Sequence, residues 1–163
     1  MTAALVPPGV AVADIGSDHA YLPVHLVRSG ISPRAIACDI AEGPLENARK
    51  TVKRAGLEHK IELRLSDGFS RYADPDPSRW CFVLAGMGGT LMARLLDAAP
   101  WLQAPCTTIV AQPMRRAGDL RAWLIANGFV IETETACRDA GRVYLALRAR
   151  YDGIERVYPP SYI

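Results

Sequence analysis

The segment that most constrains this chain is a short apolar stretch that runs into a turn with one glycine and two flanking aspartates. It reads Val-Ala-Asp-Ile-Gly-Ser-Asp-His-Ala-Tyr-Leu-Pro over residues 12–23. A strand, a glycine turn and a helix in this order are typical of the nucleotide-binding edge of an α/β sheet. Turns that bind phosphate use several glycines, whereas this turn has only Gly16, and Asp18 would repel a phosphate. The segment therefore predicts a cofactor loop for a ligand other than a phosphate.

Two more acids fall at the ends of predicted strands. Asp39 closes the apolar run at 35–38, and Asp67 follows the run at 61–65. The spacing from Gly16 to Asp39 suits a carboxylate that binds ribose hydroxyls. With Asp14 and Asp18, four acids are expected around one ligand. S-adenosylmethionine fits this set better than NAD or ATP, because it carries a sulfonium, an ammonium and a ribose but no phosphate.

Apolar runs of strand length alternate with segments of helical periodicity. Strands are predicted at 10–15, 35–39, 61–65, 81–85 and 107–111, helices at 20–29, 42–55, 90–98 and 118–127, and a loop at 72–78. Two last strands at 129–136 and 142–150 are predicted to form a hairpin. The alternation predicts a doubly wound, Rossmann-like α/β sheet, mostly parallel, with its ligand crevice beyond the carboxyl ends of the strands. The antiparallel C-terminal hairpin is typical of class I methyltransferases.

Composition limits the remaining possibilities. The 163 residues suffice for one α/β domain, and the net charge of +2 does not by itself indicate a nucleic-acid-binding protein. The cysteines lack metal-ligand spacing, so no metal site is expected, and they are interpreted as reduced, mostly buried thiols: Cys38, Cys81, Cys106 and Cys137. The first twelve residues lack a basic leader and run straight into the first strand, and no apolar stretch is long enough to span a membrane. A soluble, cytoplasmic protein is expected.

The motifs together resemble one family. The segment at 13–23 is accompanied by Glu-Gly-Pro at 42–44, Ser-Asp-Gly at 66–68, Ala-Gly-Met-Gly-Gly-Thr-Leu at 85–91, and Ala-Gln-Pro at 111–113 with Leu-Arg-Ala-Trp-Leu at 120–124. In this order they resemble the bacterial tRNA (adenine-22-N1)-methyltransferases over residues 10–150. The resemblance implies a class I fold, S-adenosylmethionine as methyl donor, and N1 of an adenine in tRNA as acceptor.

The predicted site divides into three groups of residues. The expected cofactor-binding residues are Asp14, Gly16, Ser17, Asp39, Ile40, Asp67, Gly68 and Gly86. The expected catalytic residues are Asp18, His19 and Met87. The expected substrate-binding residues are Tyr21, Gly88, Arg115 and Arg116, the two arginines as phosphate contacts.

Several of these roles have a structural alternative. Asp18 can stabilise the positive charge that develops on the methylated adenine, or simply cap the helix that follows. His19 can relay a proton or contact the base, or serve only as a hydrogen-bonding group. Tyr21 can stack with Met87 on a flipped base, although packing in the helix core is slightly favoured. The glycines at 86, 88 and 89 leave room for a planar base, or form a tight turn.

The resemblance also sets expectations for the ends of the chain. Family members usually carry a helical extension after the catalytic domain and a helical segment before it. Residues 1–150 are therefore interpreted as the methyltransferase domain and 151–163 as an extended tail or the beginning of such an extension. The alternatives are a methyltransferase acting on a small molecule or a protein, and a non-catalytic S-adenosylmethionine-binding module. An NAD-dependent dehydrogenase ranks last, because the glycines for a pyrophosphate are absent.

Overall fold

The computed structural model describes residues 1–70 and 76–156, and its centre is a seven-stranded sheet in the order β3-β2-β1-β4-β5-β7-β6. The strands are β1 (Ala11–Ile15), β2 (Ala35–Asp39), β3 (Ile61–Leu65), β4 (Trp80–Ala85), β5 (Thr108–Gln112), β6 (Phe129–Asp139) and β7 (Arg142–Tyr151). The helices are α1 (Tyr21–Arg28), α2 (Glu42–Ala55), α3 (Gly89–Asp97) and α4 (Ala117–Ala126). Three short 3₁₀ helices complete the described elements: η1 (Thr2–Leu5), η2 (Pro77–Arg79) and η3 (Pro100–Leu102).

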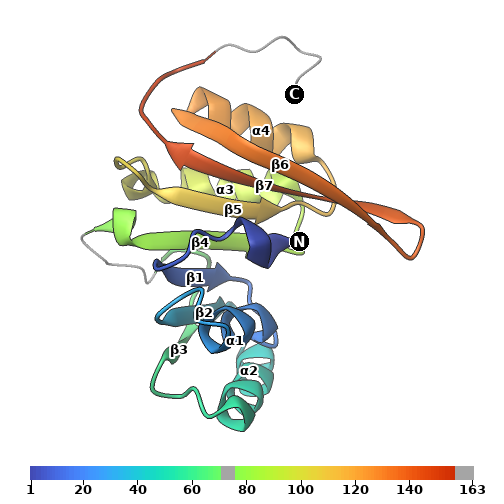
Figure 1. The fold of residues 1–163 in the computed structure, drawn as a ribbon. Coiled ribbons are helices and arrows are strands. Elements are labelled where there is room, and N and C mark those ends of the chain that lie inside the picture. Colours follow the sequence, from blue (N-terminus) through green and yellow to red (C-terminus); the bar gives the residue numbers. More distant parts are fainter. Residues whose placement is uncertain (71–75, 157–163) are drawn as a thin grey trace.

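The first five strands pair in parallel, and β7 turns the sheet antiparallel. Val12 of β1 lies opposite Ala35 of β2, and Ala13 lies opposite Phe82 of β4. β7 pairs antiparallel with both β5 and β6. β6 and β7 form a long hairpin (Figure 1). The predicted Rossmann-like sheet with an antiparallel C-terminal hairpin is thus confirmed, and all predicted strands and helices are present with their ends shifted by at most a few residues.

Alternating side chains of the central strands fill two cores, one on each face of the sheet. On one face Phe82 and its strand neighbours pack against α3, α4 and η3; on the other Val12 and Val83 pack against η1, α1 and α2. Phe82 is fully buried and meets the rings of Phe69 and Trp101 edge-on, with centroids 5.8 and 5.5 Å away. Burying such a side chain contributes about 1.5–3 kcal/mol, which stabilises the sheet that carries the loops at its edge.

Some details differ from the sequence-based expectations. The residues before β1 include the 3₁₀ helix η1, whose Leu5 packs into the core, instead of running straight into the strand. Cys38 and Cys81 are buried, and burial raises the pKa of each thiol to about 12. Cys106 and Cys137 are exposed, contrary to expectation, because both lie in segments outside the two cores.

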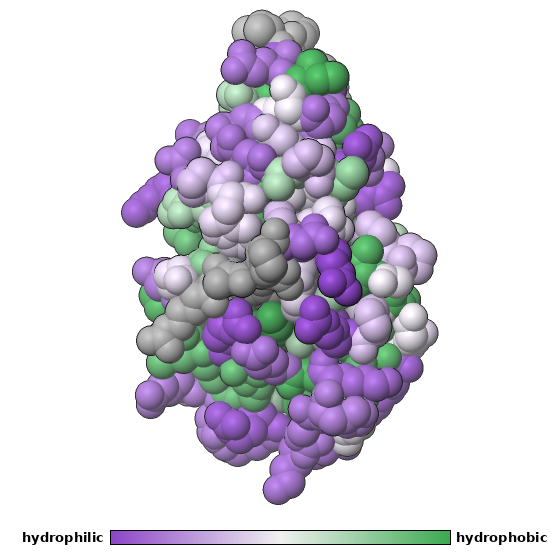
Figure 2. Space-filling model, turned by 90° about the vertical axis from the view of Figure 1, so that its left-hand side faces the viewer, coloured by the Kyte–Doolittle hydropathy of each residue, from purple (hydrophilic) through white to green (hydrophobic). Residues whose placement is uncertain are grey.

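Parts of two predictions lie outside the described residues. They are 72–75 of the predicted loop and 157–163 of the predicted tail. No helix of the described segments is long and apolar enough to cross a membrane. Figure 2 shows the side of the molecule that is on the left in Figure 1, where hydrophilic residues predominate and hydrophobic ones form smaller groups between them.

Candidate functional site

A cavity of about 180 Å³ lies at the carboxyl ends of β1, β2 and β3 and is closed on one side by α3. This is the edge at which a doubly wound sheet is expected to bind its ligand. Its lining joins residues from four separate parts of the chain: Ile15, Gly16, Asp39, Ile40, Ser66, Asp67, Gly68, Met87, Leu91 and Leu95. Six of these were predicted site residues, so the fold brings the separate motifs to one place.

The turn after β1 forms the floor of the cavity. Gly16 has φ +74°, a conformation that glycine adopts without strain, and its N–H and that of Ser17 both donate to the carbonyl of Cys38. A Cβ on Gly16 would lie 2.9 Å from Cε of Met87. The glycine therefore allows both the tight turn and the close approach of the 86–89 loop.

Asp14 lies behind this turn and does not line the cavity. Its side chain is buried and accepts a hydrogen bond of 2.6 Å from the hydroxyl of Ser17. Burial raises the pKa of Asp14 to about 6, against the lowering effect of the Ser17 hydrogen bond. Of the four acids expected around the ligand, Asp14 is thus placed to support the turn from behind.

Asp39 and Asp67 are the two acids that line the cavity. Asp39 accepts backbone N–H bonds from Asp18 (3.2 Å) and from Ala41 (3.1 Å), so it fixes the turn after β1 relative to the end of β2. A carboxylate offers about four lone-pair positions, so both of its oxygens keep acceptor capacity for a ligand hydroxyl. The exposed hydrophobic side chain of Ile40 lies beside it, next to an apolar wall of Leu91 and Leu95.

Asp18, His19 and Tyr21 form the rim of the turn. Asp18 Oδ2 lies 3.5 Å from His19 Nε2, and the rings of His19 and Tyr21 stack with centroids 5.3 Å apart. The capping alternative for Asp18 is wrong, because α1 has Ala20 at its N-cap and no side-chain cap. Core packing of Tyr21 is also wrong: its side chain is 65% exposed, since it begins α1 on the solvent side.

The backbone of this rim is strained. Asp18 and Ala20 both have positive φ, 50° and 57°, although neither is glycine. Such conformations cost on the order of 1–3 kcal/mol each and cluster at ligand-binding and catalytic sites. The side chains of Asp18 and His19 are exposed, on the turn that follows the cavity residue Gly16.

The 86–89 loop after β4 is held by the segment that follows β5. Gly86 N–H donates to Gln112 Oε1 at 3.1 Å, and Met114 N–H donates to the carbonyl of Met87 at 2.9 Å. Gln112 is 8% exposed, one of the few buried polar residues of the described chain. The sequence analysis missed Gln112 as a site residue, although its place at the end of a predicted strand was the available signal.

The loop also packs closely against the start of α4. Gly89 N–H donates to the carbonyl of Arg115 at 2.9 Å, and a Cβ on Gly89 would lie 2.2 Å from the carbonyl oxygen of Arg116. Arg115 is exposed beside Gly88, whereas Arg116 forms an ion pair of 3.0 Å with Asp119. Arg115 is therefore the freer of the two predicted phosphate contacts.

Four cavity residues were missed by the sequence analysis: Ile15, Ser66, Leu91 and Leu95. Leu91 and Leu95 lie one helical turn apart in α3, a spacing that sequence alone assigns equally well to core packing. Residues 1–70 and 76–156 contain no group of three or more possible metal ligands.

Comparisons with known proteins match the sequence and the fold to methyltransferases. The profile of the methyltransferase-domain family matches residues 1–147. A Streptococcus pneumoniae protein assigned as a tRNA (m1A22) methyltransferase, solved in complex with S-adenosyl-L-methionine, is 37% identical, with TM-score 0.88 over 96% of this chain and 72% of the other. The chain belongs to the tRNA (adenine-22-N1)-methyltransferase family.

Two further comparisons concern the Bacillus subtilis relative. The tRNA (adenine(22)-N(1))-methyltransferase of Bacillus subtilis strain 168 is 33% identical over 91% of this chain and 65% of its own length. The crystal structure of the B. subtilis m1A22 tRNA methyltransferase TrmK has TM-score 0.86 at 33% identity, over 92% of this chain and 63% of that one. The chain thus spans somewhat less than two thirds of the length of the curated relatives it matches.

Proposed function

We propose that this chain transfers a methyl group from S-adenosylmethionine to N1 of an adenine in tRNA. Its family indicates adenine 22 as the target. The observation that carries the proposal is the cavity at the ends of β1–β3, where Asp39 and Asp67 face apolar side chains of α3. The Streptococcus pneumoniae relative, which has the same fold, was solved in complex with S-adenosyl-L-methionine. Because tRNA would be the acceptor, we place the enzyme in the cytoplasm.

The residues of the cavity fit this cofactor. The carboxylate of Asp39 suits the ribose hydroxyls, and Ile40 and Leu91 offer apolar surface to the adenine ring. No several-glycine turn for a pyrophosphate is present, since Ser17 and Asp18 follow Gly16 directly. This favours S-adenosylmethionine over a dinucleotide.

The reaction mainly requires that the methyl carbon and adenine N1 be aligned. N1 of adenine has a free lone pair, so no base is needed to create the nucleophile, and the cofactor would supply an electrophilic methyl carbon on its sulfonium. Holding the two reacting atoms in line can contribute roughly 7–11 kcal/mol. In our proposal Gly16 and Met87, which lie in contact across the cavity floor, position the methyl end of the site.

Asp18 and Tyr21 would act on the adenine. The target base must leave its stack to expose N1, and the exposed ring of Tyr21, stacked on His19, offers it an aromatic surface. As the N–C bond forms, positive charge moves to the base, and the Asp18 carboxylate would stabilise it. In the neighbouring 86–89 loop, a Cβ on Gly86 would meet no atom within 4 Å, so this glycine would leave space beside Met87 for a planar ring.

The proposal is tested by incubating the protein with labelled S-adenosylmethionine and unmodified bulk tRNA, followed by mass spectrometry of the nucleosides. We expect label in 1-methyladenosine. Asp18→Ala should keep cofactor affinity and lose most of the transfer rate, whereas Asp39→Ala should weaken cofactor binding. Glu58→Ala, which removes an exposed acid next to the opposite edge of the sheet, is the matched control. Equal loss of cofactor binding in the Asp18 and Asp39 variants would remove the catalytic role of Asp18.

A further inference from the structure

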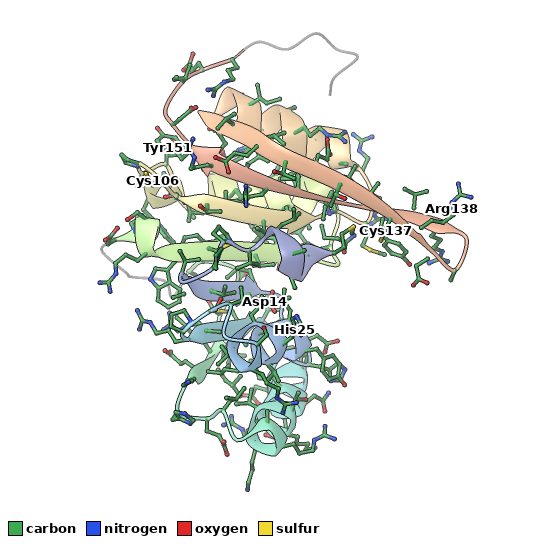
Figure 3. All side chains as sticks on the ribbon, in the orientation of Figure 1. Asp14, His25, Cys106, Cys137, Arg138 and Tyr151 are labelled. Carbon is green, nitrogen blue, oxygen red and sulfur yellow. The ribbon has the colours of Figure 1, made fainter. Side chains whose placement is uncertain are left out.

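The β6–β7 hairpin extends beyond the edge of the sheet where the site lies. Ala111 of β5 pairs with Leu147 of β7, so the last residue of β5, Gln112, is level with Ala146. β7 begins four residues earlier, at Arg142. At roughly 3.3 Å per residue, the hairpin reaches about 13 Å past the end of β5. Figure 1 shows this projection, and Figure 3 shows Cys137 and Arg138 near its end.

The end of the hairpin stands in solvent. Every residue from 136 to 143, which we call the hairpin tip, is exposed, and the side chain of Val143 is 64% exposed. Ala146 and Leu147, by contrast, are fully buried in the two cores. The tip therefore contributes little to the core, although its strands stay paired up to Asp139 and Arg142.

Arginines of the hairpin differ in their partners according to where they lie. Near the base, Arg148 and Arg150 both bond to Glu132, at 3.1 and 2.6 Å, and Arg121 of α4 bonds to Glu134 of β6. At the tip, Arg138 and Arg142 take part in no ion pair within the described residues, although Asp139 lies across the strands from Arg142. Two guanidinium groups thus remain available at the far end.

The tip shares its side of the molecule with Arg115. Both lie beyond the carboxyl end of β5, one on the loop to α4 and the other on the neighbouring strand pair. With a net charge of only +2, the chain as a whole attracts a polyanion weakly, so RNA affinity must come from local groups whose charge is not neutralised by acids. Arginines suit phosphate because their planar fork of donors matches its oxygens.

We propose that the hairpin tip is an RNA-binding arm, in which Arg138 and Arg142 contact backbone phosphates of the tRNA while the target adenine enters the site beside β1 and β4. This inference rests on the proposed function and adds to it a surface that holds the substrate outside the active site. The arm positions the RNA and takes no part in methyl transfer.

The test measures binding of an unmodified tRNA transcript by fluorescence anisotropy over a series of salt concentrations. The double variant Arg138→Gln/Arg142→Gln is compared with Arg28→Gln/Arg79→Gln, which removes the same charge from exposed arginines at the opposite edge of the sheet. Losing two phosphate contacts should lower the slope of log K against log salt by about 1.4–1.8 and weaken binding roughly 20- to 60-fold at 0.1 M salt.

Three further readouts separate the possible outcomes. The tip variant should raise KM for tRNA with kcat and S-adenosylmethionine affinity unchanged, and its unfolding midpoint should equal that of the control pair. If both double variants bind tRNA with the affinity and salt slope of the wild-type protein, the hairpin tip is not an RNA-binding arm. The proposed function would still stand. Absence of any tRNA binding or methylation by the wild-type protein would overturn the proposed function, and the arm with it.

Discussion

Gly89→Ala tests how the 86–89 loop is fixed. An added Cβ would lie 2.2 Å from the carbonyl oxygen of Arg116 and 2.9 Å from its carbonyl carbon, both backbone atoms that cannot rotate away. The start of α3 would have to move from the segment after β5, and the hydrogen bond from Gly89 N–H to the carbonyl of Arg115 would be lost.

The magnitude follows from these contacts. Overpacking costs about 1–3 kcal/mol, and the lost hydrogen bond costs about 1 kcal/mol. The helix gains up to about 1 kcal/mol when glycine becomes alanine. The free energy of unfolding should therefore fall by about 2 kcal/mol, which lowers Tm by roughly 4–8 °C in a domain of this size.

The assay is urea and thermal unfolding of Gly89→Ala beside Gly43→Ala. Gly43 also lies in the first turn of a helix, α2, but a Cβ there would meet no atom within 4 Å. The control should be neutral or stabilised by up to about 1 kcal/mol. If both variants unfold at the same midpoint, the close packing of α3 on the Arg115–Arg116 backbone does not constrain the 86–89 loop.

Two more substitutions address buried polar groups of the site. Because burial raises the pKa of Asp14 from 3.8 to about 6, the folded state holds this proton more tightly than the unfolded state, so stability falls as pH rises from about 4 through 6. Asp14→Asn should remove up to about 3 kcal/mol of that fall, as measured by urea unfolding at pH 4 and pH 7, and an unchanged pH profile would contradict it. Gln112→Ala removes the side-chain acceptor of the Gly86 N–H, which keeps only the backbone carbonyl of residue 112 at 3.2 Å, and should cost about 1 kcal/mol and lower methyl transfer about tenfold at saturating cofactor. The exposed Gln103→Ala is its control, and equal transfer rates would refute the positioning role.

The sequence predicted the parts of the site that depend on strand ends. Asp39 and Asp67 could be placed together because the carboxyl ends of parallel strands share one edge, and the turn at Gly16 marked that edge. The side of the turn on which each acid lies could not be predicted. Asp14 turns inward to Ser17, whereas Asp18 is exposed on a strained backbone whose N–H donates to Asp39, 21 residues away in sequence.

Other features depended on contacts between distant segments. The role of Gln112 exists only because β4 and β5 are neighbours, which brings its side chain to Gly86, 26 residues away in sequence. The exposure of Tyr21 depended on where α1 begins, a boundary that periodicity leaves uncertain by a residue or two. The reach of the β6–β7 hairpin followed from the register of β5 with β7, which the sequence pattern does not define.

The most direct test of the central claim uses two tRNA transcripts that differ only at nucleotide 22, adenine in one and guanine in the other. Each is incubated with the protein and labelled S-adenosylmethionine, and the digested nucleosides are separated by mass spectrometry. We expect labelled 1-methyladenosine from the adenine-22 transcript and none from the guanine-22 transcript. Equal label in both transcripts would contradict the assigned position, and no label in either, with the cofactor bound, would contradict tRNA as the acceptor.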